Sequence, residues 1–240
     1  RPGWIMKDAA ARASLRTRGG RTCARRRHSV AHAIPPLPRS RMPDRAAALA
    51  LVHAYTESDS LRRHMLAVEA AMRAYARRFG EDEERWALAG LLHDFDYERW
   101  PNAARAADAE HPAEGVRRLR ALGYPDDVCD AILGHADYTG VPRTTRMARA
   151  LYAVDELTGL ITAVALVKPS RSVHDVDVAG VRKRMKDKAF ARGVNREDVV
   201  RGAEALEMPL DAHIAIVLEA MRGEAAALGL AGAGTAGAGV

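Results

Sequence analysis

Apolar residues recur at spacings of three and four along most of the chain between Pro43 and Gly223. In residues 61–80 this spacing joins Leu61, His64, Met65, Val68, Met72, Tyr75 and Phe79. Such spacing is typical of an amphipathic helix, and the Gly80 that follows is a common residue just past a helix end. The pattern therefore predicts a helix that ends at Gly80, with His64 on its apolar face.

The same periodicity predicts most of the remaining secondary structure. Further helices are expected within residues 81–94, 111–123, 124–136, 145–167, 177–187, 195–206 and 209–222. Pro112 and Pro125 stand at plausible first helical positions, and Asn195 with Asp198 three residues on makes a box-like helix start. Strand-type alternation and hairpin turns do not stand out, so the chain is predicted to be all-α.

Two terminal segments differ from this helical part. Residues 1–42 are rich in Arg and broken by Gly and Pro, and residues 224–240 are rich in Gly and Ala. We expect a basic, disordered N-terminal extension over 1–42, a single helical domain over 43–223 and a flexible tail over 224–240. An extension ahead of a start at Met42 is favoured over a disordered basic arm or a transit-like segment.

The charge distribution argues against a nucleic-acid-binding domain. The net charge is +6, but residues 1–43 hold eleven of the 37 Lys and Arg residues and one of the 31 Asp and Glu residues. The helical part is therefore slightly acidic, and specific nucleic-acid binding is not expected. Cys23 and Cys129 form neither a metal-type pair nor a disulfide framework, as is usual for a protein of the reducing cytoplasm. The longest apolar run is shorter than the ~20 residues that a membrane span needs.

Polar residues with metal-ligating side chains stand within or beside these apolar helices. They are His64, His93, Asp94, His111, His135 and Asp155. A lone His on an apolar face is usually a hydrogen-bonded core residue, but buried carboxylates are costly and six such positions need a shared partner. Imidazole and carboxylate are ligands of Fe, Mn and Zn, and four His with two Asp suit two metal ions that share a carboxylate.

The order of these six residues resembles that of the HD-domain superfamily of metal-dependent phosphohydrolases, whose name comes from its His-Asp doublet. The stretches "LLHDFDYER", "LYAVDELTGLI" and "DKAFARGVNRE" also resemble a small, stand-alone branch of predicted HD hydrolases. The resemblance implies an HD-type helical bundle with two divalent metal ions. His64, His93, Asp94 and Asp155 would hold one ion, and His111 and His135 the other, with Asp94 as the bridge.

The implied reaction is hydrolysis of a phosphate ester or anhydride by activated water, on a nucleotide or another small phosphorylated substrate. Lys188 and Arg192 are four residues apart and would supply positive charge for the developing oxyanions, if their segment is helical. Asp96 is expected either to orient a ligand histidine, to relay protons, or to cap a helix end. Residues 95–110 form a long irregular connection that could act as a lid.

Two other functions use the same residues. Di-iron oxygenases of the same superfamily share this ligand order, and a non-enzymatic module could keep the site for nucleotide sensing. The resemblance of the C-terminal stretches favours the hydrolase.

Overall fold

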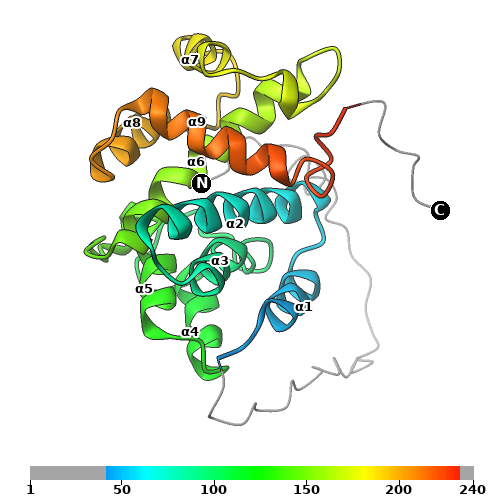
Figure 1. Cartoon of the computed structure of the whole chain (residues 1–240). Coiled ribbons are helices and arrows are strands. Elements are labelled where there is room, and N and C mark those ends of the chain that lie inside the picture. Colours follow the sequence, from blue (N-terminus) through cyan, green and yellow to red (C-terminus); the bar gives the residue numbers. More distant parts are fainter. Residues whose placement is uncertain (1–41, 233–240) are drawn as a thin grey trace, which may run out of the picture.

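The computed structural model describes residues 42–232, and this part of the chain is a bundle of α-helices (Figure 1). In chain order the helices are α1 (Arg45–Tyr55), α2 (Asp59–Phe79), α3 (Glu83–Leu92), α4 (Ala113–Ala121), α5 (Asp126–Gly134), α6 (Arg146–Leu166), α7 (Val178–Lys186), α8 (Arg196–Ala205) and α9 (Leu210–Gly223), with short 3₁₀ turns at Asp137–Thr139 and Val173–Asp175. The all-α prediction is confirmed. The residues described include one isolated β-bridge, Ser172 to Ala231, and no strand.

Most helices begin at a side-chain cap. Ser58, Asp82, Thr145 and Asn195 each accept a backbone N–H from the first turn of the helix that follows. These bonds satisfy donors that have no partner within the helix, which fixes where each helix begins. At the other end of α2, Gly80 adopts a left-handed conformation (φ 70°), as its position in the sequence predicted.

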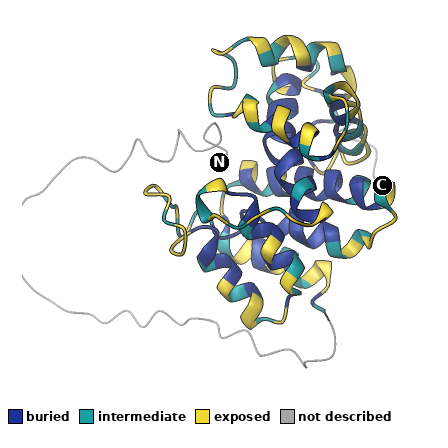
Figure 2. Cartoon of the chain, turned by 90° about the vertical axis from the view of Figure 1, so that its left-hand side faces the viewer, coloured by how far each residue is buried: buried dark blue, intermediate teal, exposed yellow. Residues whose placement is uncertain are grey.

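Two long helices organise the core. Figure 1 shows α2 crossing the middle of the molecule, and it packs against α3, α6 and α9. Helix α6 is buried along most of its length and also packs against α5 and α8. Figure 2 shows a continuous buried interior, and the polar residues buried on these two helices include His64 on α2 and Asp155 on α6.

Three sequence expectations change in detail. Pro112 and Pro125 occupy the position before the first helical residue, because α4 begins at Ala113 and α5 at Asp126. The packed part of the domain also extends beyond the predicted boundary at Gly223, although α9 ends there. Apolar side chains of the next residues are buried, Leu228 and Leu230 among them, and the Leu230 carbonyl accepts the Val173 N–H.

The predicted extension 1–42 lies almost wholly outside the described residues, as do residues 233–240. Among residues 42–232, no helix is both long and apolar enough to cross a lipid bilayer.

Candidate metal centre

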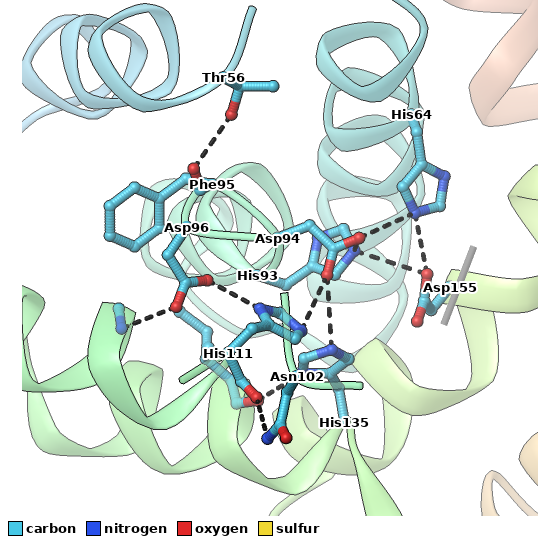
Figure 3. A network of polar contacts seen from close by, with 12 residues as sticks. Thr56, His64, His93, Asp94, Phe95, Asp96, Asn102, His111, His135 and Asp155 are labelled. Carbon is cyan, nitrogen blue, oxygen red and sulfur yellow. Dashed lines mark hydrogen bonds and ion pairs between the residues drawn. The ribbon is translucent and has the colours of Figure 1, made fainter. Parts of the chain in front are cut away.

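Five segments of the chain bring the six candidate ligands together (Figure 3). His64 projects from α2, Asp155 from the middle of α6, and the doublet His93–Asp94 directly follows α3. His111 stands two residues before α4, and His135 is the residue that follows α5. All six are buried, with 6% or less of each residue exposed, as the sequence predicted for a shared polar centre.

Asp94 occupies the centre of this cluster. Its Oδ2 lies 3.4 Å from His93 Nε2 and 4.0 Å from His64 Nε2. Its Oδ1 lies 3.4 Å from His111 Nε2 and 3.6 Å from His135 Nε2. Each carboxylate oxygen therefore faces its own pair of imidazoles, which is the arrangement of a carboxylate that bridges two sites.

Asp155 completes the first half of the cluster. Its Oδ1 lies 2.9 Å from His64 Nε2 and 3.5 Å from His93 Nε2. Two groups have closely spaced donor atoms, His64–His93–Asp94 and Asp94–His111–His135. Within each group these atoms all lie within 4.8 Å of one another. Ligand bonds of ~2.0–2.2 Å place adjacent ligands of one ion roughly 3–4 Å apart, so both groups have the spacing of a metal site.

In His93 and His135, the ring nitrogen that points away from the cluster, Nδ1, is already hydrogen-bonded to a backbone carbonyl. Nδ1 of His93 donates to the Gly90 carbonyl at 2.8 Å, and Nδ1 of His135 donates to the Ile132 carbonyl. A neutral imidazole carries one proton, so the Nε2 atoms that point into the cluster are then acceptors. They face carboxylate oxygens, which also only accept, and lone pairs that face each other need a cation between them, either a proton or a metal ion.

The electrostatics of the doublet agree with this requirement. The buried atoms without a hydrogen-bond partner include His93 Nε2 and Asp94 Oδ2, which face each other. Burial lowers the pKa of His93, but the Asp94 and Asp155 carboxylates outweigh it and raise the pKa to about 10. Burial likewise raises the pKa of Asp94, but the surrounding histidines hold it well below its usual range. The cluster thus attracts positive charge, and its nitrogen and oxygen donors fit divalent ions such as Fe, Mn or Zn.

Asp96 fixes His111 and caps α4. One carboxylate oxygen accepts the His111 Nδ1–H at 2.7 Å, and the other accepts the Gly115 backbone N–H at 2.8 Å. Asp96 is 1% exposed, and a Cβ on Gly115 would lie 2.6 Å from its Cγ. Carboxylate partners of this kind set the tautomer and orientation of a ligand histidine. Asp96 therefore has the contacts of an orienting residue and of a helix cap, while its role at a metal site stays a prediction.

Residues 95–110 hold the site together through further contacts. Asn102 was missed in the sequence, yet its side chain donates to the carbonyls of Ala106, Ala109 and His111 and accepts the Ala106 N–H. Tyr138 also donates to the His111 carbonyl, at 3.1 Å. A single Asn between Pro and Ala residues gives no sequence signal, because its partners depend on the path of the loop.

The side chains of Lys188 and Arg192 take part in none of the cluster contacts described above. Both are exposed, and their segment, residues 188–193, forms turns between α7 and α8. The expected helical face that would join the two side chains is therefore wrong. Their catalytic role stays a prediction. The neighbouring Gly193, by contrast, lines a cavity beside the cluster.

That cavity has a volume of about 440 Å³ and reaches His135. Its wall comes from the loop after α5, from α6, from the start of α8 and from the 95–110 connection. The lining residues are Arg105, His135, Ala136, Asp137, Tyr138, Tyr152, Glu156, Gly193, Asn195 and Asp198. Its size is that of a site for a small molecule, and it brings open space up to one of the six candidate ligands, His135.

A helical bundle whose buried His and Asp side chains could hold divalent metal ions has the architecture of a metal-binding helical domain. Residues 61–160, which contain all six candidate ligands, match the family model of the HD domain. The chain therefore contains an HD domain over these residues, and most members of the superfamily that this domain defines are metal-dependent phosphohydrolases. Comparison with curated proteins and with solved structures gives no match.

Proposed function

We propose that this protein is a metal-dependent phosphohydrolase that uses two divalent ions to hydrolyse a phosphate ester or anhydride of a small molecule. The observation that carries the proposal is the position of Asp94. Each of its oxygens faces a separate pair of imidazole Nε2 atoms, at 3.4–4.0 Å. Two ions that share one carboxylate are a common arrangement for hydrolysis of phosphate compounds.

His64, His93 and Asp155 would hold one ion, His111 and His135 the other, and Asp94 both. When bound, such ions activate water and offset the negative charge that develops on a phosphoryl group. Imidazole and carboxylate ligands suit Fe, Mn and Zn alike, so any of the three ions could occupy the two positions.

The protein itself supplies orientation and a buried environment. The Gly90 and Ile132 carbonyls and the Asp96 carboxylate hold a proton on Nδ1 of His93, His135 and His111, respectively. This leaves Nε2 of each ring as the nitrogen that faces inward and would bind an ion. All six ligands are buried; among the described residues one cavity reaches His135 and a smaller one reaches His64. The cavity beside His135 is where a small phosphorylated substrate, such as a nucleotide, would bind.

Metal analysis combined with a phosphate-release assay tests the proposal. The protein, loaded with Fe, Mn or Zn, would be offered a panel of nucleotides and small phosphate esters. We expect about two metal equivalents and release of inorganic phosphate, which disappears in Asp94→Asn. The control Asp126→Asn alters a carboxylate whose side chain is 87% exposed on α5 and should leave both readouts unchanged.

Two results would contradict the proposal. Equal phosphate release by the wild type and Asp94→Asn would show that the activity does not belong to this site. A mixed-valent di-iron signal in electron paramagnetic resonance, together with substrate-dependent oxygen consumption and no phosphate release, would identify an oxygenase instead.

A further inference from the structure

The cavity beside His135 is dominated by carboxylates. Asp137, Glu156 and Asp198 line it, and Arg105 is the only Lys or Arg side chain that does so among the described residues. Two of the carboxylates are matched by arginines that do not line the cavity. Asp137 pairs with Arg143 at 2.8 Å, and Asp198 pairs with Arg201. A phosphate group that enters this cavity would therefore meet Arg105 as its one available cationic side chain.

The guanidinium of Arg105 has no carboxylate partner. Within residues 42–232 it forms no ion pair, and its residue is exposed. Arg143 and Arg201 are bound to carboxylates, but Arg105 lies without a carboxylate partner on the wall of an otherwise acidic cavity. An unpaired guanidinium can form two parallel hydrogen bonds to a phosphate, a geometry that a point charge such as Lys does not match.

The backbone of Arg105 is held in an unusual conformation. Its φ is +57°, in the left-handed region that Gly or Asn adopts more readily than Arg. The Arg105 N–H donates to the Asn102 carbonyl at 3.2 Å, and the Asn102 side chain bonds both Ala106 and the carbonyl of His111. The turn that carries Arg105 is thus tied to a candidate metal ligand. Strained residues persist where the surroundings enforce them, often at ligand-binding sites.

We infer that Arg105 is the phosphate-binding residue of the substrate cavity, presented beside His135 by the turn that Asn102 closes. The ligand class is a small molecule that bears a phosphate monoester or terminal phosphate. This inference rests on the proposed function for its choice of phosphate as the anion. It assigns to Arg105 the charge that the sequence had suggested for Lys188 and Arg192, neither of which lines the cavity.

Calorimetric titration with inorganic phosphate tests the assignment without turnover. Metal-loaded wild type, Arg105→Gln and Arg105→Gly would be compared at equal metal content. Loss of a charge-assisted contact predicts that the dissociation constant for phosphate rises between about 10-fold and 100-fold in both variants. Arg105→Gly relaxes the left-handed backbone, so an equal loss of affinity there assigns the effect to the guanidinium and not to strain.

Arg171 provides a matched control. It is also exposed, also has a left-handed backbone (φ 54°), and its N–H donates to the carbonyl three residues earlier. It does not line the cavity, so Arg171→Gln should bind phosphate as the wild type does. Metal content, measured on the same samples, should be unchanged in all three variants, and the melting temperature should be unchanged in the two Gln variants.

The outcomes separate this inference from the proposed function. If the protein releases phosphate from esters but Arg105→Gln binds inorganic phosphate as tightly as the wild type, the inference is overturned and the function stands. If phosphate binds through Arg105 but no phosphate compound is hydrolysed, the function fails and the binding site stands. A wild type that binds no phosphate overturns the inference directly.

Discussion

Gly115→Ala should disturb the metal centre from outside the ligand set. A Cβ at this position would lie 2.6 Å from Asp96 Cγ, 2.7 Å from Oδ2 and 2.9 Å from Oδ1, all closer than nonbonded atoms approach. Asp96 is buried beside it and must shift. The shift breaks its hydrogen bonds to the Gly115 N–H and to His111 Nδ1, so His111 loses the partner that orients it.

The magnitude follows from these two bonds. A hydrogen bond to a charged group contributes about 1.5–3 kcal/mol, so loss of both costs roughly 3–6 kcal/mol. Replacement of Gly by Ala in a helix returns about 1 kcal/mol. The net loss of about 2–5 kcal/mol corresponds to a fall in melting temperature of roughly 5–15 °C for a domain of this size class. Loss of an orienting partner also weakens metal binding by about 10-fold to 100-fold.

Gly180→Ala is the matched control, because Gly180 occupies the same place in α7 as Gly115 does in α4. Its N–H also donates to an aspartate, Asp177, whose Oδ1 would lie 2.8 Å from the added Cβ. Asp177 is exposed and can move into solvent, so this variant should keep its melting temperature and metal content. Differential scanning calorimetry and elemental analysis after dialysis measure both. Wild-type stability and full metal content in Gly115→Ala would refute the reasoning.

Three further predictions concern stability and metal. Burial lowers the pKa of His213 to about 4, below the ~6.5 of an unfolded chain, so its contribution to stability is present above pH 6.5 and is lost as the pH falls to 4. Denaturant titrations should therefore show a loss of about 3 kcal/mol over this range that His213→Gln lacks; equal slopes would contradict the assignment. Gly202→Ala places a Cβ 2.5 Å from Ala153 Cα, and by separating α8 from α6 it should lower the free energy of unfolding by about 1–3 kcal/mol. A Cβ at Gly223 meets nothing within 4 Å, so Gly223→Ala should leave thermal melts unchanged. Chelation should lower the melting temperature of the wild type more than that of Asp94→Asn, and equal shifts would argue against a resident metal.

The helices and the six candidate ligands could be predicted because both leave local or compositional signals. Apolar periodicity gave α2 and α6, and a polar residue such as Asp155 in the most apolar helix is conspicuous in the sequence. His213 lies outside the candidate ligand set and is a structural residue, since it bonds Tyr75 and the Ala153 carbonyl in the core.

What could not be predicted depends on contacts between distant segments. Asn102 and Arg105 acquire their positions from the path of an irregular loop, which no periodicity encodes. The packing of Leu228 and Leu230 was hidden by the Gly and Ala residues that surround them, because composition alone indicated a flexible tail. Lys188 and Arg192 were paired because a helix would place residues four apart on one face. Their segment forms turns, so this spacing gives the two side chains no shared face.

The residues after the His-Asp doublet connect these two kinds of information. The Phe95 carbonyl accepts the Thr56 hydroxyl, and the Glu98 carboxylate accepts the N–H groups of Glu57 and Ser58. Ser58 is the cap of α2, the helix that carries His64. The stretch that follows the doublet is therefore bonded to the start of the helix that supplies another ligand. Through these bonds Phe95 and Glu98 fix the position of the doublet relative to the helix that carries His64.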